Sequence, residues 1–128
     1  MKPVVSEWVA KGEADLLSAL REFRARKSPN YDDACFHAQQ CAEKYMKAAL
    51  QHLDVRFART HNLIDLLERL LPGDSTWELL RPGLLRLNLF SVAYRYPGRT
   101  ADKPVAREAL ALARLVRAKA REALKLSS

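Results

Sequence analysis

The sequence contains no apolar run that approaches the roughly 18 residues needed to cross a membrane. Its first residues also lack the apolar stretch of a secretory signal peptide. We therefore expect a cytoplasmic protein with no membrane association. A hydrophobic content of 48% beside 29% charged residues is typical of a globular chain, and we expect one domain, 1–128, with its own core.

Cysteine and glycine are also scarce. The two cysteines, Cys35 and Cys41, would lie about 9 Å apart along the axis of a predicted helix, which is too far for a disulfide. No CxxC motif or paired-histidine spacing accompanies them, so we expect reduced thiols and no metal site. The four glycines form neither GxGxxG nor another phosphate-binding loop, and we expect no cofactor.

No segment alternates apolar and polar residues with the period of a β-strand. Apolar residues recur instead at helical spacing, which predicts long helices over about 6–26, 33–53, 61–71 and 102–126. The chain is therefore predicted to be all-α: an antiparallel up-and-down helical bundle of four long helices plus one or two short segments.

Local signals predict where the helices begin and break. Ser6 is expected to cap the first helix and Thr60 the third. A capping box at 75–78 begins a further helix, and Pro82-Gly83 is expected to kink or break it before residues 84–92.

The stretch 33–50 is the most distinctive part of the sequence, because it contains no glycine, proline or β-branched residue. One face of this predicted helix carries small residues and one aromatic: Ala34, Ala38, Cys41, Ala42, Tyr45, Ala48 and Ala49. We expect neighbouring helices to approach this face closely. The opposite face is unusually polar, with Phe36, Gln40, Glu43 and Lys47, flanked by His37, Lys44 and Gln39. We interpret this second face as a ligand site or a subunit interface.

Several motifs occur in a fixed order along the chain. They are Trp8 with Ala14-Asp15-Leu16, the stretch 31–48, Thr60-His61-Asn62-Leu63, and Arg95-Tyr96-Pro97. Together they resemble the HEPN domain (higher eukaryotes and prokaryotes nucleotide-binding) over nearly the whole chain. The resemblance implies a helical bundle that forms a homodimer or higher oligomer and binds a nucleotide or RNA.

The resemblance also implies a partner. Many HEPN domains are encoded beside a minimal nucleotidyltransferase, and such pairs often act as toxin and antitoxin. This chain lacks the Gly-Ser and paired aspartates of that enzyme, so it is not the nucleotidyltransferase itself. We expect it to pair with a separately encoded nucleotidyltransferase subunit.

Other HEPN domains are ribonucleases, which carry an arginine followed four to six residues later by a histidine near the last helix. Here Arg95 stands at that place and no histidine follows it. An Arg-x4-His string does run from Arg56 to His61, but it lies in the link before the third helix. We therefore favour a protein that is not an enzyme. The alternatives are a metal-independent ribonuclease toxin that uses Arg56, His61 and Arg95, and a structural interaction module without a ligand.

The residues expected to bind a nucleotide or RNA are His37, Gln40, Lys44, Lys47, His61, Tyr94, Arg95 and Tyr96. His61 at a helix start suits an anion, or else it hydrogen-bonds a neighbouring helix. A guanidinium between two aromatic rings suits a base and a phosphate, or else Arg95 pairs with an acid such as Glu43. Glu43 and Lys47 are spaced for an i,i+4 ion pair. We expect the second helix, His61 and the loop 94–96 to converge.

The net charge of +7 is compatible with phosphate-bearing partners. From Arg99 to the end of the chain, eight basic residues face three acidic ones. Arg107, Arg114 and Arg121 follow one another at seven-residue spacing on the last predicted helix. This basic stripe is either a solvated face or a docking surface for RNA or an acidic partner.

Overall fold

Five α-helices and one short 3₁₀-helix make up the computed structural model, which describes residues 1–127. In chain order they are α1 (Pro3–Arg24), α2 (Tyr31–His52), α3 (Leu63–Leu70), η1 (Ser75–Leu80), α4 (Arg81–Ala93) and α5 (Lys103–Ala123). No strand occurs within residues 1–127, and the predicted all-α bundle is confirmed. No helix in this part of the chain combines the length and apolar character needed to cross a membrane.

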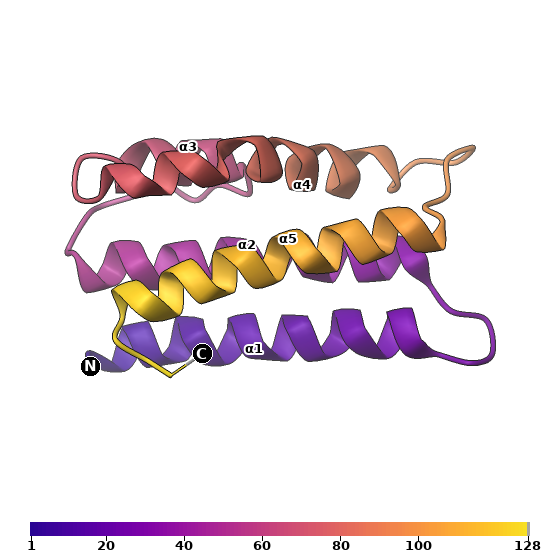
Figure 1. Cartoon of the computed structure of the whole chain (residues 1–128), viewed down its shortest axis with the longest axis horizontal. Helices are drawn as coiled ribbons and strands as arrows, with labels where there is room; N and C mark the ends of the chain where they lie inside the picture. The colour runs from indigo at the N-terminus through magenta and orange to yellow at the C-terminus, as the bar shows by residue number, and fades with distance from the viewer. Residues whose placement is uncertain (128) are drawn as a thin grey trace.

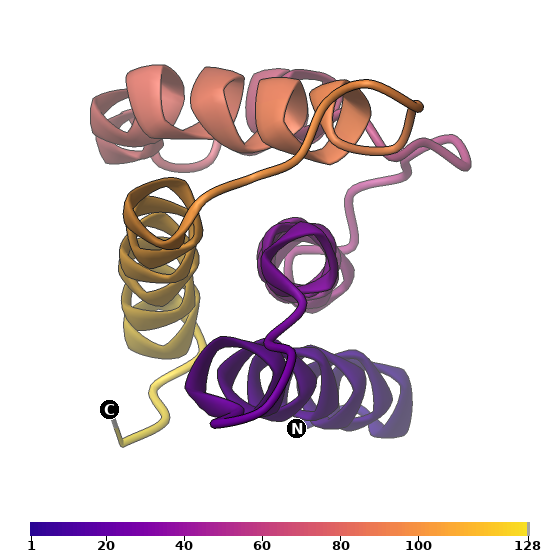
Figure 2. The same cartoon turned by 90° about the vertical axis from the view of Figure 1, so that its right-hand side faces the viewer.

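Helix α2 lies at the centre of the bundle. It contacts α1, α3, α4 and α5. The layer of α3 and α4 covers one side of α2, and α1 covers the opposite side (Figure 1). Viewed along the bundle, α5 runs down a third side (Figure 2). A helix surrounded in this way buries most of its circumference.

The small-residue face of α2 allows this close packing. All seven residues predicted for that face are buried. At Gly12 of α1, a Cβ atom would lie only 2.9 Å from Cδ2 of the Tyr45 ring. Glycine therefore permits the close approach of α1 to α2, which explains a residue that otherwise weakens a helix interior.

Helix α3 begins later than the sequence predicted. Thr60 was expected to cap it, but the Thr60 hydroxyl accepts a hydrogen bond from the backbone N–H of Asn62 (3.0 Å) in the preceding turn. The cap is Asn62, whose Oδ1 accepts from the Ile64 N–H at 2.9 Å. His61 therefore lies before the helix, and its side chain is directed towards α2.

The segment after α3 also differs from the prediction. Residues Ser75–Leu80 form a 3₁₀-helix, capped by Asp74 and not by Ser75. Pro82-Gly83 does not interrupt a helix, because Pro82 occupies the first turn of α4, where its missing N–H has no role.

The outer helices differ from the prediction at their ends. Helix α1 begins at Pro3, so Ser6 is not its cap, and proline stands in its first turn. It ends at Arg24, and α5 ends at Ala123, both short of the predicted boundaries.

Two arginines of α5 turn into the bundle. Nη2 of Arg117 lies 2.6 Å from Oε1 of Glu13 on α1, and Nη1 of Arg121 lies 3.2 Å from the same oxygen. Arg121 also donates to the Tyr45 hydroxyl of α2 (3.0 Å). The predicted basic stripe is thus shorter than expected, because Arg121 joins three helices while Arg107 and Arg114 stay exposed.

These contacts make stability depend on acid pH. Burial by itself raises the pKa of Glu13, but hydrogen bonds from Arg117 and Tyr45 outweigh burial and hold that pKa below its ordinary value of 4.5. Since the folded pKa is lower than the unfolded one, ionised Glu13 stabilises the fold above pH 4.5, and this contribution is lost as pH falls through the folded pKa. We predict that Glu13→Gln lowers Tm at neutral pH and has little effect once Glu13 is protonated.

Thermal unfolding followed by circular dichroism between about pH 7 and pH 3 measures this difference. The control is Glu7→Gln, which changes an exposed carboxylate on the same helix. A Glu13→Gln effect that stays constant over the whole pH range would contradict the prediction.

Candidate functional site

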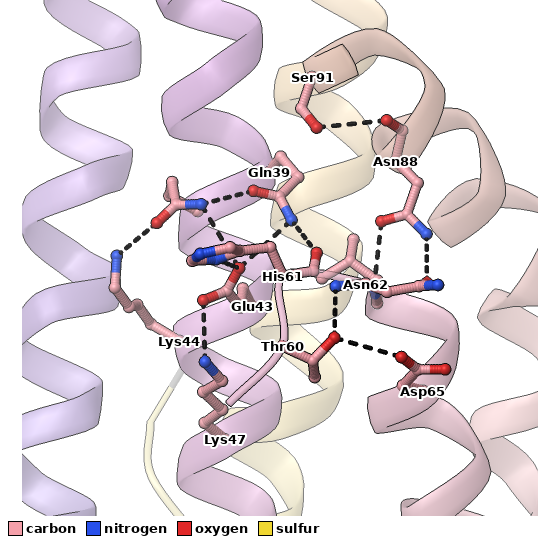
Figure 3. Close-up of polar contacts among 12 residues, drawn as sticks. Gln39, Glu43, Lys44, Lys47, Thr60, His61, Asn62, Asp65, Asn88 and Ser91 are labelled. Atoms are coloured by element: carbon pink, nitrogen blue, oxygen red, sulfur yellow. Dashed lines mark hydrogen bonds and ion pairs between the residues drawn. The ribbon is translucent and has the colours of Figure 1, made fainter. Parts of the chain in front are cut away.

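The polar face of α2 is built around a buried carboxylate. The Glu43 side chain is 2% exposed. One of its oxygens lies 3.0 Å from Nδ1 of His61, and the other accepts from Nζ of Lys47 at 3.0 Å. Figure 3 shows these contacts where α2 faces the segment that leads into α3. The predicted ion pair between Glu43 and Lys47 is confirmed, but it is a buried pair and not a surface one.

His61 is held at two points although its side chain is 83% exposed. The amide of Gln39 donates to the His61 backbone carbonyl at 2.8 Å, and Glu43 contacts the ring. Because an ionised carboxylate only accepts hydrogen bonds, Nδ1 carries the proton in this contact. The Nε2 edge of the ring is then left towards solvent. The hydrogen bond from His61 to a neighbouring helix, one of the two interpretations of this residue, is confirmed, and it holds one edge of the imidazole against α2.

The Lys47 ammonium is enclosed by protein groups. Its side chain is 8% exposed. Besides the carboxylate of Glu43, it lies 5.3 Å from the ring centre of Trp8 and 5.9 Å from that of Phe57. Both rings present a face to the cation, which is a favourable electrostatic arrangement. The Lys47 ammonium therefore interacts with groups inside the protein and has little contact with solvent.

The other predicted residues of α2 extend the polar network towards α1. The Gln40 amide donates to the Gln39 side chain (2.7 Å) and accepts from Lys44 (3.0 Å). Lys44 and His37 both contact Asp15 of α1, at 2.6 and 2.9 Å. Hydrogen bonds thus connect Asp15 continuously to His61 across the surface of α2.

The loop 94–96 meets α2 at a different place. The Arg95 guanidinium lies 5.1 Å from the ring centre of Phe36, while Tyr94 is tilted against Phe90 and Tyr96 is exposed. Of the two interpretations of Arg95, the pairing with Glu43 is wrong, because Lys47 and His61 contact that carboxylate. Phe36 precedes Glu43 by seven residues, about 10 Å of helix. The expected convergence of α2, His61 and the loop 94–96 at one place is therefore wrong: α2 meets His61 at Glu43 and Arg95 at Phe36.

Comparison with known proteins agrees with this architecture. A family model described as the HEPN domain matches residues 5–123. The chain belongs to the HEPN family. A crystal structure of TT1696 from Thermus thermophilus is similar to it, with a TM-score of 0.80 and 27% identity, covering 93% of this chain and 97% of that one. No curated protein matches the sequence.

The residues proposed for ribonuclease chemistry are not assembled in this HEPN domain. Arg56 is exposed on the link, and Arg95 stacks on Phe36. Within residues 1–127, no hydrogen bond or ion pair joins either arginine to a histidine. His61 is held by Glu43 and Arg95 by Phe36, so the two side chains have separate partners on α2.

The cysteines lie away from this chemistry. Both are free and buried. Burial raises the pKa of each thiol to about 12, with smaller contributions from nearby carboxylates, so both remain protonated and unreactive. Within residues 1–127, no cluster of three or more histidine, cysteine or acidic side chains is arranged to hold a metal ion.

Gln39 and Glu43 were missing from the predicted binding residues. Both lie on the buried side of α2, and together they position His61. A signal was present in the sequence, since Gln39, Glu43 and Lys47 follow one another at four-residue spacing and so share one face of a helix. The sequence did not show that this face is covered.

The buried pair in this HEPN domain gives a stability prediction. Glu43→Gln keeps the shape of the side chain but leaves the Lys47 ammonium without a counter-charge. Removing one partner of a buried ion pair typically costs about 3–5 kcal/mol. We predict that Glu43→Gln lowers the free energy of unfolding by roughly this amount, as measured by urea denaturation.

The double variant Glu43→Gln/Lys47→Met is the matched control, because it removes both charges. It is expected to be more stable than Glu43→Gln alone, because it leaves no unpaired charge buried in the protein. If Glu43→Gln changes stability by less than about 0.5 kcal/mol, the range of an ordinary surface substitution, the carboxylate is not the counter-charge we describe.

Proposed function

We propose that this HEPN protein is a nucleotide- or RNA-binding subunit that works with a separately encoded minimal nucleotidyltransferase in a toxin–antitoxin-like module. The observation that carries the binding proposal is the His61 imidazole. It is exposed to solvent, yet Glu43 fixes its ring and Gln39 fixes its backbone. An exposed side chain held by two buried groups is pre-organised for a partner outside the fold.

The charge of the chain supports a phosphate-bearing ligand. The net charge is +7, and Arg56 and Arg59 are exposed on the link that leads to His61. Arg107 and Arg114 are exposed on α5. Basic groups on several elements favour association with nucleic acid or nucleotides through long-range attraction.

Assembly into a homodimer is part of the proposal. Helix α4 exposes Leu85, Leu89 and Val92, which lie at helical spacing on one outer face. Exposed aliphatic rows of this kind are typical of surfaces that contact another protein. Because HEPN domains commonly form dimers, we infer that a second copy of the chain covers this face of α4.

The binding proposal predicts the effect of one substitution. A hydrogen bond accepted by the neutral His61 ring contributes about 0.5–1.5 kcal/mol, so His61→Ala is expected to weaken binding by about two- to tenfold. Isothermal titration calorimetry with ATP, GTP and a short single-stranded RNA measures this. The matched control is His52→Ala, which removes an exposed histidine at the end of α2 and should leave affinity unchanged.

Failure of the wild-type protein to bind any of these ligands would overturn the binding proposal. Purification from the native host, with identification of co-purifying protein and nucleotide, tests the nucleotidyltransferase partner. Light scattering on the same sample gives the number of copies. Capture of a partner other than a nucleotidyltransferase would contradict the proposed module.

A metal-independent ribonuclease is the second candidate, and the Glu43–His61 contact is the observation that favours it. A carboxylate on Nδ1 leaves Nε2 able to accept a proton, as a general base requires. Cleavage of RNA in EDTA by the wild-type protein, but not by His61→Ala, would establish this candidate and replace the non-enzymatic function.

A further inference from the structure

A groove opens beside the His61 site, between the link 55–60 and helix α3. Its volume is 530 Å³, within the range of about 300–1,000 Å³ typical of small-molecule sites. Apolar groups form much of its lining, namely Val55, Phe57, Leu66 and Pro72. The polar residues of the lining are Thr60, Asp65, Glu68 and Arg69.

Two connections make this groove continuous with the His61 site. Thr60 lines the groove and directly precedes His61 in the chain. The ring of Phe57 also lines it and lies over the Lys47 ammonium, which in turn pairs with Glu43. A ligand in the groove therefore contacts the segment whose conformation the buried carboxylate fixes.

Asp65 provides the distinctive chemistry of the groove. One of its carboxylate oxygens accepts a hydrogen bond from the Thr60 hydroxyl at 3.2 Å. In the part of the chain that the structure describes, no lysine, arginine or histidine pairs with Asp65. Glu68 differs, because it forms an ion pair with Arg81 at 2.6 Å. Asp65 is thus the carboxylate of the groove that retains acceptor capacity for a ligand.

A carboxylate with free acceptor capacity selects among nucleobases. Guanine presents two adjacent donors, N1–H and the N2 amino group, which match the two oxygens of a carboxylate. Adenine, cytosine and uracil do not present this pair of donors on one edge. An ionised carboxylate cannot donate a hydrogen bond, so it cannot pair with the acceptor atoms on the edges of these other bases.

We propose that the groove binds the base of a guanine nucleotide, with Asp65 accepting from N1–H and N2–H and the apolar lining contacting the ring. Arg69, exposed at the groove and without an ion-pair partner within residues 1–127, supplies positive charge for the phosphate. This inference rests on the nucleotide-binding function proposed above and assigns that function a base preference.

The test compares three nucleotides that differ only at the base edge. GMP carries both donors, IMP lacks the N2 amino group, and AMP lacks both at these positions. One bidentate contact to a base typically discriminates by about 1–3 kcal/mol, so GMP is expected to bind about tenfold more tightly than AMP, with IMP between them. Calorimetry with each nucleotide measures the order.

Asp65→Asn tests the residue. Asparagine keeps an oxygen for the Thr60 hydroxyl but replaces the second acceptor by a donor, so the preference for GMP over AMP should disappear. Glu122→Gln, which changes an exposed carboxylate of α5 outside the groove, is the control and should leave the preference intact. Thermal unfolding of both variants verifies that they remain folded.

The outcomes separate this inference from the proposed function. The guanine site is supported if Asp65→Asn loses the preference for GMP while the control variant keeps it. Equal affinities for the three nucleotides, or a preference that survives Asp65→Asn, would overturn the guanine site while leaving nucleotide binding in place. Binding of a peptide or a partner protein in the groove, with no nucleotide bound by the wild type, would overturn both.

Discussion

The structure depends on a carboxylate that has been removed from water. Moving an ionised group such as Glu43 into the interior is costly, and the cost is offset only where hydrogen bonds and an opposite charge replace the solvent. Lys47 provides the charge, and His61 provides a second hydrogen bond. The amides of Gln39 and Gln40 approach the same carboxylate at 3.5 and 3.4 Å. Every group that satisfies Glu43 is thereby fixed in position.

This constraint links the core of the bundle to its surface. Three of the four groups come from α2 itself, at positions about one turn from Glu43, whereas His61 comes from the segment before α3. The carboxylate thus holds that segment against the central helix. The same segment contributes Phe57 and Thr60 to the groove, so Glu43 helps to hold one wall of the proposed ligand site. Rigid support of this kind is what a binding site on an otherwise irregular segment needs.

Much of the fold could be predicted from local patterns. Helical periodicity located every long helix, and the small residues of α2 correctly indicated its buried face. The positions that were wrong share a cause. Thr60 and Ser75 each have the side chain of an N-cap, but the neighbouring residues Asn62 and Asp74 accept from the first helical N–H groups, those of Ile64 and Thr76. Sequence places such boundaries only to within a residue or two. Pro82 was compatible both with a kink inside one helix and with the first turn of a new helix. Sequence alone does not show that η1 ends at Leu80, just before it.

The candidate site was harder to predict for a different reason. A wheel of α2 gives the direction of each side chain, but it does not give the number of neighbouring helices. Gln39, Glu43 and Lys47 are buried because α2 is covered on several sides, which is a property of the whole bundle. The pairing of His61 with Glu43 joins residues 18 positions apart, and no local pattern specifies it.

The buried Glu43 carboxylate fixes the His61 ring with its proton on Nδ1. Long-range proton–nitrogen correlation spectra of ¹⁵N-labelled protein measure this directly, at a pH where the ring is neutral. We expect the Nδ1–H form for His61 in the wild type, with Nε2 unprotonated, and a change in this pattern in Glu43→Gln. A wild-type His61 protonated on Nε2, or identical His61 signals in the two proteins, would contradict it.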